Sequence, residues 1–158
     1  MSDRPPVLLT RRLPEEVVRF LEDRTDLTLD PEDRPIPRDD LLRDISGKDG
    51  VVSMLTDRID IEVLEAAGDR LRVVSNYAVG YDNVDVDACT RRGVLVTNTP
   101  DVLTDATADL ALGLILAAAR RIVEGDRAVR RGTPWSWAPT FMLGREVSAK
   151  TLGVVGFG

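Results

Sequence analysis

Histidine is the most informative absence from this sequence, because none of its 158 residues is a histidine. Histidine is the side chain that most often transfers protons near neutral pH, so this chain cannot itself supply a histidine acid or base. The single cysteine, Cys89, cannot form a disulfide within the chain, and no Cys/His metal site is possible. We therefore predict no metal ion, and we expect Cys89 to be a small buried hydrophobic residue.

Positive charge and long apolar runs are also scarce. The formal net charge of −6 argues against binding to nucleic acid, because such proteins need a cationic face to contact phosphates. The longest apolar run, Leu110–Ala119, is far shorter than a bilayer span, and the first ten residues contain no apolar signal core. These features predict a soluble cytoplasmic protein with neither nucleic acid nor a membrane as a partner.

The first hundred residues alternate between short apolar runs and helical patterns. Each parallel return of a strand requires a crossover, so this alternation predicts an α/β fold with a parallel sheet covered on both faces. We expect a flavodoxin-like domain over residues 1–99. Gly68 and Gly93 are expected to end two of its helices. The predicted strands span 6–10, 26–30, 49–55, 70–78 and 94–98, and the predicted helices span 13–24, 37–45, 59–69 and 84–93.

The following residues have a different pattern. A helix is predicted over 101–121, and it is apolar on all sides between Leu110 and Ala119, so it needs cover on most sides. A polar helix over 122–132 follows, and then a loop, 133–150, that contains both tryptophans of the chain. Because one small domain has little surface with which to cover these groups, we expect the long helix and the loop to lie between domains or between subunits.

The last residues read TLGVVGFG. A short strand is predicted over residues 152–155, and it leads into Gly156-x-Gly158. Two glycines at this spacing after a strand are the beginning of the G-x-G-x-x-G turn that binds dinucleotide phosphates.

Several linked motifs together resemble one family. The run VVSNYAVGYDNVDVDACTRRGVLVTNTPDVLTDATADLALGLILAAARR, followed later by LGREVSAKTLGVVGFG, is similar to the D-isomer-specific 2-hydroxyacid dehydrogenases, and most similar to their glyoxylate and hydroxypyruvate reductase branch. The resemblance implies a substrate domain that is interrupted by an inserted NAD(P)-binding domain, with the crossover at residues 98–101. Residues 100–158 would then be the incomplete start of a Rossmann domain, containing its first helix, a dimerisation arm and its first strand.

The resemblance also implies roles for individual residues. The backbone amides of Val79 and Gly80 would hold the substrate carboxylate, although a simple glycine turn between strand and helix explains the same residues. Thr104 would border the nicotinamide end of the cofactor; a plain helix cap is the competing account, and both roles can hold together. Trp137 would reach the substrate pocket of the partner subunit in a homodimer, or anchor the dimer interface as a buried hydrophobic residue. Gly156 and Gly158 would bind the phosphates of NAD or NADP.

The family's catalytic arginine, histidine and carboxylate would all follow the glycine fingerprint, so we predict no catalytic residue within these 158 residues. The chain is therefore expected to be an N-terminal fragment that is inactive alone. Its parent enzyme would transfer hydride between nicotinamide and a small 2-oxo or 2-hydroxy acid, but neither the acid nor the choice between NAD and NADP can be read from the sequence. The alternative is a non-catalytic flavodoxin-like module for binding or dimerisation, and the coding sequence after Gly158 distinguishes the two.

Overall fold

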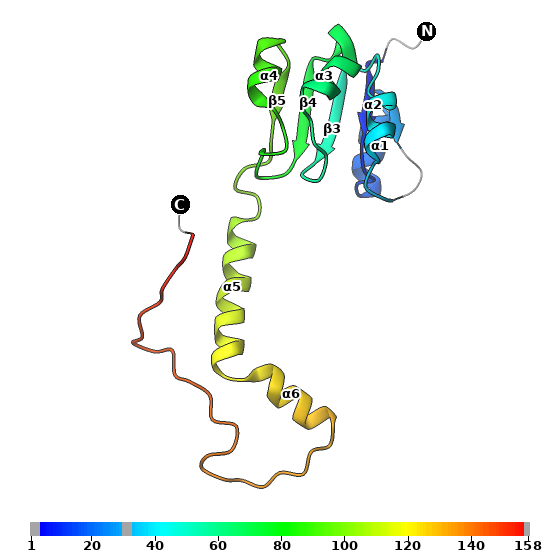
Figure 1. Ribbon diagram of the computed structural model, residues 1–158. Helices are drawn as coiled ribbons and strands as arrows, with labels where there is room; N and C mark the ends of the chain where they lie inside the picture. Colours follow the sequence, from blue (N-terminus) through cyan, green and yellow to red (C-terminus); the bar gives the residue numbers. More distant parts are fainter. Residues whose placement is uncertain (1–3, 30–32, 157–158) are drawn as a thin grey trace. The chain divides into compact units, whose positions relative to one another are not determined.

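The computed structural model describes residues 4–29 and 33–156 (Figure 1). It divides into two compact units, residues 1–102 and 103–158, and each is described here by itself.

The first unit contains a parallel five-stranded sheet with the order β2-β1-β3-β4-β5. This is the strand order of flavodoxin-like folds, so the predicted fold class is confirmed. The register pairs Leu8 with Val51 and Val51 with Val74, which places these apolar residues side by side across the central strands. The strands are β1 (Pro6–Leu9), β2 (Asp26–Leu29), β3 (Gly50–Met54), β4 (Val73–Tyr77) and β5 (Leu95–Thr97). The last residue of the second predicted strand, Asp30, lies outside the described residues.

Four helices connect the strands, as the sequence predicted. They are α1 (Glu15–Glu22), α2 (Arg38–Asp44), α3 (Ile61–Ala67) and α4 (Val86–Arg91). The carboxylates of Asp60 and Asp85 accept hydrogen bonds from the first turns of α3 and α4, which satisfies amides that have no partner within the helix. The predicted stops are confirmed at Gly68 and Gly93, whose φ angles of 73° and 69° suit glycine. Pro14 precedes α1 as its N-cap residue.

The core of this unit lies between the sheet and the helices that cover it. Ile45, Ile59, Val63, Val74 and Cys89 are completely buried. The prediction that Cys89 is a buried hydrophobic residue is therefore confirmed. Burial raises the pKa of its thiol, and the nearby carboxylate of Asp85 raises it further, because both disfavour the thiolate.

The second unit contains two helices and a long irregular segment. The helices are α5 (Thr104–Ala119) and α6 (Ile122–Arg130), and between them Arg121 adopts a left-handed conformation with φ of 56°. Neither helix contains a buried residue, although α5 is strongly apolar. The predicted cover for α5 is thus not supplied by the described part of the chain. The predicted loop over 133–150 is irregular, and in it Trp135 stacks on Phe141 with 6.0 Å between the ring centroids.

The strand predicted over residues 152–155 is absent from the structure. These residues are exposed and pair with no strand among the described residues. A β-strand depends on hydrogen bonds to a neighbouring strand, so an apolar pattern without such a neighbour does not form one. None of the described helices is long and apolar enough to cross a membrane.

Candidate functional site

The candidate site is the loop that leaves β4 at Tyr77 and reaches α4 at Val86. It lies at the carboxyl end of a central strand, which is the edge where open parallel sheets bind ligands. Two of the predicted site residues, Val79 and Gly80, lie next to each other in this loop, and both are exposed.

A pair of asparagine side chains fixes the base of the loop. Asn76, almost completely buried in β4, and Asn83 exchange hydrogen bonds through their amide groups at 3.1 and 3.2 Å. The Asn76 side chain also donates to the carbonyl of Gly80 at 2.9 Å. The Asn83 side chain donates to the carbonyls of Met54 and Asp57, at 3.1 and 2.9 Å. The β4 loop is therefore bound to the end of the neighbouring strand β3.

The other side of the loop is held by the segment that follows β5. The backbone amide of Thr99 donates to the carbonyl of Ala78 at 2.9 Å, and the side chain of Asn98 donates to the carbonyl of Val79 at 2.8 Å. Together with the bond from Asn76 to Gly80, these contacts occupy three successive carbonyl groups of the loop.

Two backbone amides of the same loop have no partner among the described residues. Within the described parts of the chain, the N–H groups of Val79 and Gly80 donate to no protein acceptor. Two adjacent exposed amides without partners are donors available to an anion, as in the backbone concavities that bind phosphate or carboxylate. Since no ionisable side chain is involved, this capacity does not depend on the protonation of a protein group.

The conformation of Gly80 bears on whether a glycine is needed here for a turn or for binding a carboxylate. Its φ angle lies outside the left-handed region, and a β-carbon built on it would meet no atom within 4 Å. Neither the turn nor the packing of this chain therefore requires a glycine here. The open space above Gly80 leaves room for a ligand against its backbone.

The buried carboxylate of Asp57 accepts hydrogen bonds at the ends of the strands beside the site. It accepts hydrogen bonds from the hydroxyl of Thr10 and from the backbone amide of Met54, at 2.5 and 2.8 Å. These bonds connect the ends of β1 and β3 and shape the turn that Asn83 contacts. Asp57 therefore stabilises this edge of the sheet.

The remaining predicted residues belong to the second unit. Thr104 is the first residue of α5; the N-cap position is occupied by Leu103, and no side chain caps the helix. The alternative that Thr104 is a helix cap is therefore wrong. Trp137 is 82% exposed, so it is not a buried anchor within this chain. Gly156 is exposed with φ of 79°, and Gly158 lies outside the described residues.

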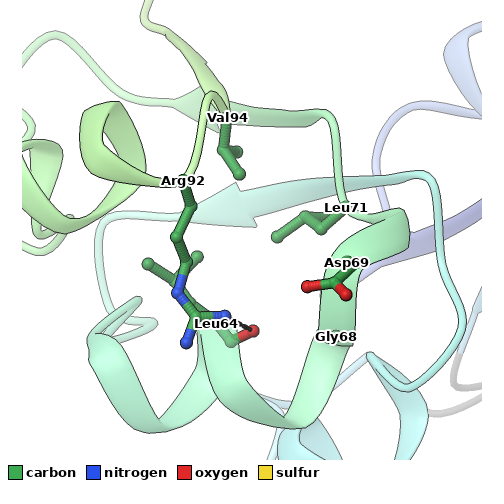
Figure 2. Close-up of a pocket in the computed structure, with 6 residues that line it drawn as sticks. All are labelled: Leu64, Gly68, Asp69, Leu71, Arg92 and Val94. Carbon is green, nitrogen blue, oxygen red and sulfur yellow. Dashed lines mark hydrogen bonds between the residues drawn. The ribbon is translucent and has the colours of Figure 1, made fainter.

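A separate hollow of about 210 Å³ lies at the opposite edge of the sheet (Figure 2). Leu71 and Val94, which line it, come just before β4 and β5 rather than after them. The guanidinium of Arg92 closes one side by donating to the carbonyl of Leu64 at 2.8 Å. Because this hollow is at the amino ends of the strands, it is not part of the candidate site.

Sequence reasoning missed the three asparagines that hold the loop, Asn76, Asn83 and Asn98. A signal for Asn76 was present, because side chains alternate along a strand and Asn76 shares the core-facing side of β4 with Val74. A polar side chain at a core position needs hydrogen-bond partners, so it predicts a local network. The partners of Asn83 and Asn98 could not be predicted, because they depend on the path of the loop.

Comparison with known proteins identifies the family to which this chain belongs. Residues 7–153 match the family model for the D-isomer specific 2-hydroxyacid dehydrogenase, catalytic domain. The glyoxylate reductase of Thermococcus kodakarensis is 52% identical over 160 residues, which cover 98% of this chain and 47% of that protein. The chain thus spans about half the length of the curated relatives it matches.

Solved structures give the same result. A putative NAD-binding D-isomer specific 2-hydroxyacid dehydrogenase from a Polaromonas species superposes with a TM-score of 0.81 and 33% identity, over 92% of this chain and 46% of that one. An NADPH-dependent glyoxylate/hydroxypyruvate reductase from Sinorhizobium meliloti, solved with NADP and malonate, has a TM-score of 0.62 and 30% identity, over 82% of this chain and 38% of that one.

Proposed function

Because this chain belongs to the D-isomer-specific 2-hydroxyacid dehydrogenases, we propose that it supplies the substrate-carboxylate site of an NAD(P)-dependent reductase of the glyoxylate or hydroxypyruvate type. The observation that carries this proposal is the pair of free amides at Val79 and Gly80 on the carboxyl edge of the sheet. In this proposal residues 1–99 are the substrate domain, and residues 100–158 begin the nucleotide-binding domain.

The chemistry of a 2-oxo acid fits this loop. Its carboxylate is a permanent anion at neutral pH, and two backbone donors can hold it in a fixed orientation while the adjacent carbonyl carbon accepts hydride. Exposed side chains with apolar surface follow β3 or lie in and beside the loop, and where they exclude water they would strengthen hydrogen bonds to the anion. These side chains are Leu55, Tyr77, Val79 and Tyr81.

The nicotinamide cofactor supplies the hydride when it is bound. The described residues do not by themselves form a complete dinucleotide site, because no helix follows Gly156 among them to receive the pyrophosphate. The left-handed conformation of Gly156 and the empty space around it are compatible with a phosphate turn. We propose Thr104, Gly156 and Gly158 as contributors to an NAD or NADP site that other residues complete.

A homodimer is the second part of the proposal. Leu110–Ala119 and the loop over residues 135–141 are apolar and exposed, and an all-apolar helix requires cover. We propose that a second copy of the chain covers them and that Trp137 extends toward the partner's substrate site. Sedimentation of the full-length protein should give a dimer at micromolar concentration, and a monomer there would contradict this part.

The carboxylate site can be tested with the 158-residue chain and glycolate, a stable 2-hydroxy acid. In ¹⁵N-resolved NMR spectra, glycolate should shift the Val79 and Gly80 amide resonances saturably, whereas the neutral analogue glycolamide should not. Gly80→Val should weaken glycolate binding by about 1–3 kcal/mol, as expected for a lost hydrogen bond to a charged group. The melting temperature should stay unchanged, because a β-carbon at this position meets open space.

Gly153→Val is the matched control, since Gly153 is also exposed, has no positive φ, and has open space around its β-carbon. It should bind glycolate like the parent. Unchanged binding in Gly80→Val would remove this loop from the substrate site.

A further inference from the structure

We infer that Asn98 is a positioning residue, which orients the Gly80 amide toward the substrate carboxylate by holding the carbonyl of Val79. This inference rests on the proposed function, because it explains how the free amide is aimed.

The geometry of one peptide unit links Asn98 to the Gly80 amide. The carbonyl of Val79 and the N–H of Gly80 belong to the same planar group, and no cis peptide bond occurs in the described chain. In a trans peptide the C=O and the N–H point in opposite directions. A donor that fixes the Val79 carbonyl therefore also fixes the direction of the Gly80 N–H.

Asn98 provides that donor. Its side-chain amide lies 2.8 Å from the Val79 carbonyl oxygen, 19 residues away in the sequence. The bond is exposed to solvent, so its expected contribution to the stability of the fold is small. Its effect is to prevent rotation of the peptide unit that contains the Gly80 amide.

The adjacent peptide unit is held from the same side. The Thr99 backbone amide fixes the Ala78 carbonyl, and thereby the direction of the Val79 N–H. Both carbonyls face the segment Asn98–Thr99, so both N–H groups point away from it. A single stretch of chain thus holds the peptide units of both donors, and a carboxylate has two oxygens that can accept from them.

The two peptide units differ in how they can be perturbed. Thr99 acts through its backbone and keeps its N–H in most substitutions, whereas Asn98 acts through its side chain and can be removed. Asn98→Ala removes the donor, and Asn98→Leu removes it while keeping a branched side chain of similar shape. Thr97→Ala is the control, because Thr97 is exposed in the adjoining strand and its side chain has no hydrogen bond with described residues.

The test is the glycolate titration of the 158-residue chain, followed at the Val79 and Gly80 amide resonances. Both Asn98 variants should bind glycolate three- to tenfold more weakly than the parent, with the larger loss of shift at Gly80. Without ligand, the Gly80 N–H should have a lower NMR order parameter than in the parent, because its peptide unit is no longer held, which a merely structural residue elsewhere would not cause. Thr97→Ala should match the parent in both measurements.

The failures of the two proposals are distinguishable. If glycolate does not shift Val79 or Gly80 in the parent chain, the carboxylate site itself is wrong. If the parent binds glycolate and both Asn98 variants bind equally well, the site stands and the positioning role of Asn98 is overturned. Should Asn98→Ala alter the fold, the Asn98→Leu variant decides, since its side chain has a similar branched shape.

Discussion

The two units of this chain differ in the burial of their apolar helix residues. In α3 of the first unit, Val63 and Leu64 are at most 1% exposed, whereas in α5 of the second unit Leu112 and Leu114 are 57% and 60% exposed. Composition does not explain the difference, because α5 is the more apolar helix. The first unit contains its own cover, and the described part of the second does not.

The distribution of polar residues along the two helices accounts for the contrast. Glu62 and Glu65 occupy the outer face of α3 and leave one apolar face, which a sheet can cover. Helix α5 has no polar face between Leu110 and Ala119, so one covering layer is not enough for it. Helix α3 can therefore bury its apolar face within a layered α/β domain, whereas α5 needs a second domain or subunit to cover it.

The largest expected effect is the difference in unfolding free energy lost when an apolar side chain is truncated in each unit. Ile59 is completely buried, and Ile59→Ala should lower the free energy of unfolding by about 2–5 kcal/mol, because it removes buried methyl groups and leaves a cavity. Leu112→Ala changes an exposed side chain, so in the monomeric chain its effect should stay within about 0.5 kcal/mol. Chemical denaturation of both variants at low protein concentration measures the difference.

The difference between these two variants should also depend on protein concentration. If a second copy covers α5, the cost of Leu112→Ala should grow with protein concentration, while that of Ile59→Ala should not. Equal costs for the two variants in a monomer would show that α5 is packed within its own chain, contrary to the structure.

A smaller effect is expected at the helix starts, where the units also differ. Helix α3 begins with a capping carboxylate, Asp60, whereas α5 has no side-chain cap. Asp60 accepts a hydrogen bond from the Val63 amide and pairs with Arg38 at 2.6 Å. Asp60→Ala should destabilise the first unit by about 1 kcal/mol at pH 7, and Asp60→Asn by less, because asparagine also caps helices.

The Asp60 effect has a predictable pH dependence. Burial acts to raise the pKa of Asp60, but the hydrogen bonds from Arg38 and Val63 outweigh it, so the pKa lies below its ordinary value of 3.8. The stabilisation from the charged form is therefore complete above that value and is lost as the pH falls through the folded-state pKa. Parent and Asp60→Asn stabilities should converge in this acidic range, and a gap that widens there would contradict the assignment.

The sequence predicted the fold of the first unit well, because its signals are local. Alternating apolar runs and stop glycines such as Gly68 determine each element, and the short crossovers leave few topologies for a parallel sheet. It failed at residues 152–155, where the pattern of a strand is present but no neighbouring strand is available among the described residues. Local pattern is thus sufficient only where the partner of an element lies within the same unit.

The candidate site was only partly predictable for the same reason. Val79 and Gly80 were identified from the motif, but the free amides depend on carbonyls that Asn98 and Thr99 hold from 19 to 21 residues away. Such contacts follow from the path of the chain in space. Their donors, a side-chain amide and a backbone N–H, leave no distinctive pattern in the sequence.

The smallest expected effect concerns thiol reactivity. The labelling rate of a cysteine in each unit reports how accessible that unit is to solvent. Cys89 is completely buried, and burial and Asp85 raise the pKa of its thiol, so little of the reactive thiolate is present. In the folded chain Cys89 should react with a thiol reagent only through unfolding.

The variant Ala111→Cys would place a second thiol on exposed helix α5, and this thiol should react at the rate of a free cysteine. If a second copy of the chain covers α5, that reaction should slow as protein concentration rises, while the reaction of Cys89 stays equally slow throughout. Mass spectrometry of peptides labelled over time separates the two positions, and urea-unfolded protein, in which both should react alike, is the control. Fast labelling of Cys89 in folded protein would mean that the core around α4 opens readily, and the contrast between the two units would then be smaller than the structure indicates.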